Sequence, residues 1–83
     1  MNDQPVWLQV KNRMTLYHLT VAWMIERFYI RGVPVRDYNL GRFLRGQREK
    51  FKDYSIIAET ATAILDSYEK WLQEEEKNGK ENV

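Results

Sequence analysis

The chain has 83 residues, 43% of them hydrophobic, and a formal net charge of +1, which suits one small domain with one core. It contains no cysteine, so a disulfide framework and a thiolate metal site are both excluded. The first ten residues lack the features of a signal peptide, and the longest apolar run, residues 21–25, is far shorter than a membrane span. We therefore expect a cytoplasmic protein without a membrane segment.

The charge is unevenly distributed along the chain. Residues 11–52 contain ten lysines and arginines and three acidic residues, whereas residues 53–83 contain eight acidic residues and three lysines. A basic centre of this kind is compatible with a face that binds a polyanion, and the acidic part with a solvated or self-associating segment. Chance segregation of charge is the alternative.

Two helices are expected in the first part of the chain. Pro5 suits the first turn of a helix that runs to about residue 13. Thr15 is a candidate N-cap for a second helix over residues 16–30, whose middle is apolar on nearly every side. Gly32 is a natural stop for that helix.

A short helix is expected over about residues 35–45. Leu40, Phe43 and Leu44 form its apolar edge, and Gly46 ends it. The other residues of this helix are expected to point toward solvent or a ligand.

The clearest periodicity in the chain predicts the last helix. Asp53 or Ser55 can cap it, and apolar residues then recur at spacings of three and four residues over four turns. We expect the helix to fade near Glu75 and the charged tail over residues 76–83 to be disordered, because it has almost nothing to bury. The predicted fold class is all-α: a compact bundle of four to five helices over residues 1–75, with a helix-turn-helix-like central segment and a disordered acidic C-terminal tail.

Enzyme chemistry has little support in this sequence. His18 is the only histidine, and no motif around the serines favours a Ser–His–Asp triad. The acidic run at residues 74–76 is typical of a solvated helix face rather than a metal site, and no glycine-rich phosphate loop is present. We therefore expect no catalytic activity, no metal and no cofactor.

The central segment has the outline of a helix-turn-helix, in which the second helix enters the major groove of double-stranded DNA. Arg36 can donate two hydrogen bonds to guanine, and Asn39 can pair with adenine in the same bidentate way. Tyr38 could stack on a base or sugar, or cover the rim of the core. Cations at the end of the helix and just after it are available for phosphates: Arg42, Arg45, Arg48, Lys50 and Lys52.

Residues 40–48, Leu-Gly-Arg-Phe-Leu-Arg-Gly-Gln-Arg, are similar to the L-S-x-I-L-R-G-x-R ending of the recognition helix in phage repressors of the lambda-repressor-like (XRE-type) helix-turn-helix family. Residues 13–15, Arg-Met-Thr, with Leu19 four residues on, resemble the opening of that family's second helix. Ile30 and Pro34 depart from the family, which has Ala and Gly at these positions.

The resemblance implies a compact bundle of four or five helices that binds operator DNA, usually as a dimer. It also implies that five residues contact DNA, and we expect base contacts from them: Arg36, Asp37, Tyr38, Asn39 and Arg42. The predicted function is a small sequence-specific DNA-binding transcriptional regulator of phage or mobile-element type.

A protein-binding module is the alternative function, such as a phage antirepressor or an inhibitor of a host defence protein. Aromatic side chains with neighbouring arginines would then form the contact, because such residues anchor interfaces: Tyr29, Tyr38, Phe51 and Tyr54. RNA binding has weaker support, because no KH-like Gly-x-x-Gly loop is evident.

The end of the last helix offers a homodimer contact through Tyr68, Trp71 and Leu72. Trp71 and Leu72 could equally form a lid on the first helix, since they lie beyond the expected body of the domain.

Overall fold

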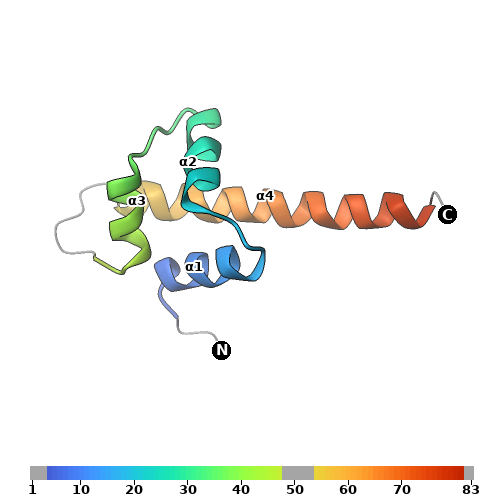
Figure 1. The fold of residues 1–83 in the computed structure, drawn as a ribbon, viewed down its shortest axis with the longest axis horizontal. Coiled ribbons are helices and arrows are strands. Elements are labelled where there is room, and N and C mark those ends of the chain that lie inside the picture. The colour runs from blue at the N-terminus through green and yellow to red at the C-terminus, as the bar shows by residue number, and fades with distance from the viewer. Residues whose placement is uncertain (1–3, 48–53, 82–83) are drawn as a thin grey trace.

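The computed structural model describes residues 4–47 and 54–81, the last five of these by their backbone alone. The described residues form four helices and no strand: α1 (Val6–Leu16), α2 (Val21–Ile30), α3 (Asp37–Leu44) and α4 (Tyr54–Glu81). In Figure 1, the three short helices gather around the first half of α4, and the second half of α4 projects beyond them. The predicted all-α fold is confirmed as a compact globule of four helices.

The core lies where the three short helices meet α4. Each helix buries one apolar stripe at spacings of three and four residues, as an amphipathic helix on a core does. The buried side chains are Val10, Met14, Met24, Phe28, Leu40, Phe43, Ile57, Ala58, Ala61, Ile64 and Leu65. Leu40 and Phe43 of the predicted α3 edge belong to this set, whereas Leu44 is only partly buried. The predicted stripe of α4 is buried in its first half, but further along Tyr68 is half-buried and Trp71 is exposed.

The boundary between the first two helices differs from the prediction. α1 continues to Leu16, and Thr15 lies inside it, with its hydroxyl donating to a carbonyl one turn earlier. α2 begins at Val21, five residues later than predicted, where the Thr20 hydroxyl accepts a hydrogen bond of 3.0 Å from the Trp23 amide. Thr20, and not Thr15, is therefore the N-cap of the second helix.

His18 accounts for this break. It has a positive φ of 58°, and the amides of His18 and Leu19 bond back to the carbonyls of Thr15 and Met14, at 3.2 and 2.8 Å. This is the Schellman arrangement that ends many helices, usually with glycine in the left-handed position. Because a histidine holds that position here, the sequence shows no sign of a helix end.

Gly32 and Gly46 end α2 and α3, as predicted. Both have positive φ, 77° and 76°, and in each case the next amide bonds at 3.0 Å to a carbonyl five residues earlier. Their surroundings differ, because a Cβ on Gly46 would lie 2.7 Å from Cε2 of Trp7, whereas a Cβ on Gly32 would meet nothing within 4 Å. Gly46 thus allows the end of α3 to approach the Trp7 ring of α1.

The start of α4 is joined to α3. The Tyr54 ring packs on Phe43, with ring centroids 5.2 Å apart. Ser55 lies inside the first turn of α4 and does not cap it, and the alternative cap, Asp53, lies outside the described residues. The first turn of α4 is therefore fixed by aromatic packing against α3.

The far end of α4 extends beyond its predicted limit. The backbone remains helical to Glu81, so the stretch 76–81 is helical, where the sequence predicts a disordered tail. Glutamate, lysine and glutamine favour helix, and one glycine in the interior costs only about 1 kcal/mol, which does not end a helix that is already formed. None of the described helices combines the length and the apolar character that crossing a membrane requires.

One ion-pair cluster ties α1 to α4. Arg13 is half-buried and donates to Asp66 at 2.8 Å, and its Nε donates to Glu69 at 2.7 Å. Burial alone would lower the pKa of Arg13, but the hydrogen bonds and charges of the two carboxylates raise that pKa above its usual value. The guanidinium therefore stays charged and links two helices far apart in the chain.

Candidate functional site

α3 is held by one face and exposes the other. Leu40 and Phe43 are both 0% exposed and dock the helix on the core, whereas Tyr38 is 66% exposed. Because successive residues turn by about 100° around a helix, Arg42 and Arg45 lie on the same side of α3 as Tyr38. We call Tyr38, Arg42 and Arg45 the α3 outer face. Three of the residues predicted to contact DNA thus come together on one surface.

The α3 outer face is locally ordered. The Arg42 guanidinium carbon lies 5.4 Å from the centroid of the Tyr38 ring, a cation–π contact one turn apart. Gly41 lies at the side of this face, about 60° around the helix from Tyr38. A Cβ on Gly41 would come within 3.2 Å of Nη1 of Arg45. The Arg45 side chain therefore lies close over the backbone of Gly41.

The other predicted DNA contacts lie at the edge of the α3 outer face or outside the described residues. Arg36 is the N-cap residue of α3 and Asp37 its first residue, and both are exposed. Asn39 is half-buried and lies to the side of the α3 outer face. The remaining predicted phosphate contacts, Arg48, Lys50 and Lys52, lie outside the described residues, as does Phe51 of the alternative protein-binding patch.

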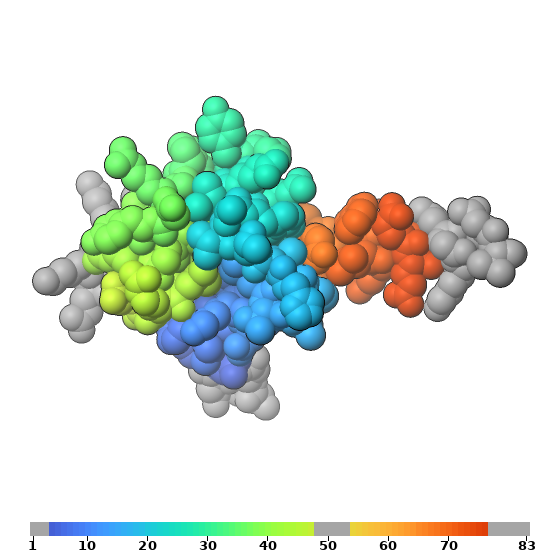
Figure 2. Space-filling model, viewed as in Figure 1, coloured from blue at the N-terminus to red at the C-terminus, as the bar shows by residue number. Residues whose placement is uncertain are grey.

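The connection between α2 and α3 is longer than the usual turn of a helix-turn-helix. It comprises six residues, 31–36, where that motif has three or four. In Figure 1 the chain ascends through α2 and descends through α3, with this connection above them. Figure 2 shows the surface of α3 at one end of the molecule and the projecting part of α4 at the other.

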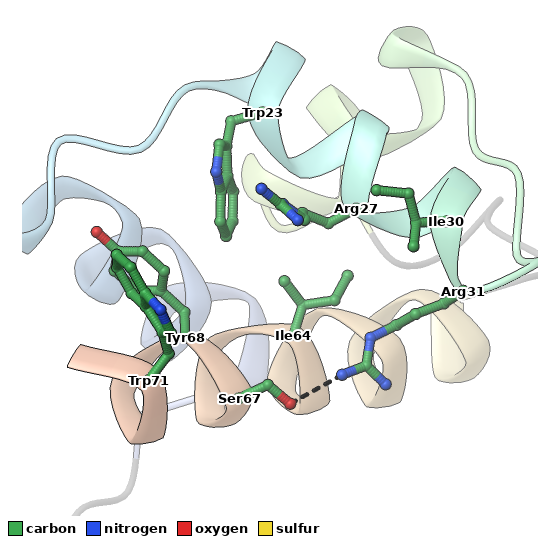
Figure 3. A pocket seen from close by; sticks show the side chains of 8 residues that line it. All are labelled: Trp23, Arg27, Ile30, Arg31, Ile64, Ser67, Tyr68 and Trp71. Carbon is green, nitrogen blue, oxygen red and sulfur yellow. Dashed lines mark hydrogen bonds between the residues drawn. The ribbon is translucent and has the colours of Figure 1, made fainter. Parts of the chain in front are cut away.

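A groove of about 650 Å³ opens between α2 and α4. Figure 3 shows its lining: Trp23, Arg27, Ile30, Arg31, Ile64, Ser67, Tyr68 and Trp71. This groove is not predicted from the sequence. The only signal for it in the sequence is the spacing of four residues between Trp23, Arg27 and Arg31, which places them on one side of α2.

The two arginines of the groove are held in place. The Arg27 guanidinium carbon lies 5.2 Å from the centroid of the Trp23 ring. Arg31 donates to the Ser67 hydroxyl at 2.9 Å and to the Ala63 carbonyl at 3.4 Å. These contacts fix two positive charges along the rim of an otherwise apolar groove.

An aromatic cluster forms one end of the groove. The Tyr68 ring packs on Tyr17, Trp23 and Trp71, with centroids 5.4, 5.3 and 5.9 Å away. Tyr68 thus covers the end of α1, while Trp71 remains 51% exposed. Leu72 is half-buried. Of the three residues predicted for a dimer contact, Trp71 is therefore the most available to a partner.

The described residues contain no group of three or more His, Asp or Glu side chains placed to hold a metal ion. No family model matches the chain, and comparison with curated proteins and with solved structures gives no match.

Proposed function

We propose that this chain is a small DNA-binding protein that places α3 against double-stranded DNA. The α3 outer face carries the proposal, because it presents two arginines and a tyrosine on a helix whose opposite side is fully buried. Arg36, exposed at the leading end of α3, adds a third cation. Cations on a helix that is docked in this way can contact phosphates and base edges without a rearrangement of the backbone.

Gly41 supports a close approach of the partner. Glycine in a helix interior lowers stability by about 0.5–1 kcal/mol relative to alanine. Within this chain, the Cβ that Gly41 lacks would meet only the end of the Arg45 side chain. Packing inside the protein therefore does not account for a glycine here, whereas a DNA backbone pressed against α3 would.

Within this proposal, the residues have separate roles. Arg45 and Arg42 bind phosphates or base edges from the α3 outer face, and Arg36 reads a base edge from the first turn. The resemblance of residues 40–48 to phage repressors favours a sequence-specific regulator of phage or mobile-element type. Asp37 at the positive end of the α3 dipole also stabilises the helix itself.

Selection from randomised duplex DNA, followed by fluorescence anisotropy between about 50 and 200 mM salt, tests the proposal. The logarithm of the binding constant should fall with the logarithm of salt by about 0.9 per phosphate contact. Arg45→Gln should weaken binding to every sequence and reduce this slope by about one. Arg36→Gln should instead reduce discrimination between selected and random DNA, by about 1–3 kcal/mol.

Lys70→Gln is the matched control, because it removes the same charge from an exposed site on α4, away from α3. It should leave both the affinity and the salt slope nearly unchanged. If Lys70→Gln weakens binding as much as Arg45→Gln does, binding reflects net charge and not α3. If no duplex is selected even at low salt, the proposal is wrong.

Gly41→Ala should change stability and DNA binding in opposite directions. Alanine favours helix, so the free energy of unfolding should rise by up to about 1 kcal/mol once the Arg45 side chain has shifted. The added methyl group would displace the Arg45 side chain, one of the proposed DNA contacts, and move the DNA away from α3, so the affinity should fall about tenfold or more. Urea denaturation and anisotropy on the same sample measure both quantities, and a variant that is more stable and binds equally well contradicts a close approach at Gly41.

Binding of another protein is the second candidate, favoured by the exposed aromatic side chains of α2 and α3. Tyr29 is 75% exposed and lies next to the exposed Ile30, and Tyr38 adds a further ring. Tyr54 does not join them, because it is half-buried against Phe43. This function would be supported if the chain binds no DNA but binds a protein, and if Tyr29→Ala abolishes that binding.

A further inference from the structure

We propose that two copies of this chain pair through α4, with the exposed acidic part of each α4 lying across the other copy's groove between α2 and α4. This inference does not depend on DNA binding. It rests on the lining of the groove, on the exposed continuation of α4, and on the match of charge between them.

The groove has an apolar floor and a basic rim. Ile64 is only 3% exposed and lies at the bottom, with the aromatic rings of Trp23 and Trp71 toward one end. Along the rim, Arg31 reaches from α2 to Ser67 of α4, and the Arg27 guanidinium lies beside the Trp23 ring (Figure 3). A partner that fits this groove carries apolar side chains next to negative charge.

The same chain presents such a surface. Ile64, Ser67 and Trp71 share one face of α4, and the spacing of three and four residues carries this face on to Glu74 and Glu75. Both glutamates are exposed on the part of α4 that projects beyond the other helices. No described side chain forms an ion pair with either of them. The face that lines the groove therefore continues as an acidic surface that nothing in the described protomer covers.

A two-fold axis near Trp71 brings the two surfaces together. If two α4 helices cross antiparallel at this residue, the position four residues after Trp71 faces the position four residues before it. Glu75 of one copy then faces Ser67 of the other, whose hydroxyl already accepts a hydrogen bond from Arg31. Each copy gives and receives this contact, as an interface between identical subunits requires.

The apolar and charged contacts contribute differently. Covering the half-exposed Trp71 against a second Trp71 and the groove removes aromatic surface from water, which drives association. The Arg31–Glu75 pairs at the rim remain partly solvated, so they select the antiparallel register more than they add affinity. Reversing one of these charges should therefore weaken the dimer, and reversing both should restore it.

Sedimentation velocity of the full chain, from about 5 to 500 µM, tests this interface. The mass should rise reversibly from 10.0 kDa toward twice that value. Glu75→Arg should raise the dissociation constant at least about tenfold, because it places a cation against Arg31. The double variant Arg31→Glu/Glu75→Arg should return to within about threefold of the parent chain.

Glu76→Arg is the control, because it makes the same change of charge at the next residue, about 100° further round α4. It should change the dissociation constant less than about twofold. Circular dichroism checks the helix content of each variant, and if Arg31→Glu disturbs the fold, the comparison of Glu75→Arg with Glu76→Arg still decides. A parent chain that stays monomeric throughout overturns the proposal, and so does a dimer that Glu75→Arg leaves intact or that Glu76→Arg weakens equally.

Discussion

Replacing Gly46 with alanine should lower the free energy of unfolding by about 2–4 kcal/mol, a large part of the roughly 4–12 kcal/mol typical of a domain this size. Two costs combine. A residue with a Cβ is strained at the φ of 76°, by about 1 kcal/mol. The new Cβ would also lie 2.7 and 2.8 Å from two atoms of the Trp7 ring, which has to move, at about 1–3 kcal/mol. Urea denaturation followed by circular dichroism measures the loss.

Gly32→Ala separates the two costs. Gly32 has nearly the same φ, 77°, and open space where a Cβ would lie. Only the strain of the backbone remains, so this variant should lose about 1 kcal/mol. Equal losses for Gly32→Ala and Gly46→Ala would mean that the Trp7 ring does not pack against Gly46 in solution.

Phe43→Ala should lower the free energy of unfolding by about 3–5 kcal/mol, the usual cost of removing a buried aromatic ring. The Phe43 side chain is fully buried and packs on Tyr54 at the start of α4. α3 has only eight residues, too few to be stable on its own, so it depends on this docking. Thermal unfolding measures the total loss, and hydrogen exchange should show that the amides of α3 lose protection first.

Tyr38→Ala provides the comparison within the same helix. Tyr38 is also aromatic, but it is largely exposed, and its cation–π contact with Arg42 accounts for at most about 1 kcal/mol. Its removal should leave α3 protected from exchange. If Tyr38→Ala destabilises the protein as much as Phe43→Ala does, α3 is docked by a different face from the one that carries Leu40 and Phe43.

Helix ends were predictable from the sequence where glycine makes them. Gly32 and Gly46 adopt the left-handed conformation that glycine favours, and both end helices at the predicted places. His18 adopts the same conformation without that chemical preference, so the boundary between α1 and α2 was misplaced. The helical stretch beyond Glu75 escapes prediction for a different reason: a segment with little to bury suggests disorder, although its residues favour helix.

The α3 outer face and the groove between α2 and α4 also differ in how far the sequence predicts them. The α3 outer face follows from the period of one short helix, so Tyr38, Arg42 and Arg45 could be placed together from the sequence. The groove depends on how α2 packs against a helix more than thirty residues later, as the bond from Arg31 to Ser67 shows. No local sequence pattern predicts which residues of α2 and α4 lie side by side. The same is true of the ion pair between Arg13 and Glu69, which joins α1 to α4.

The length of α4 has a consequence for DNA geometry. α3 packs at the start of α4, at Tyr54, seventeen residues before Trp71. With a rise of about 1.5 Å per residue, two chains that cross at Trp71 hold their α3 helices about 50 Å apart. Successive major grooves on one side of a duplex are only about 34–36 Å apart. If the proposed dimer and the proposed DNA binding both hold, the length of α4 therefore keeps the two α3 helices too far apart for adjacent half-sites of a palindrome on straight DNA.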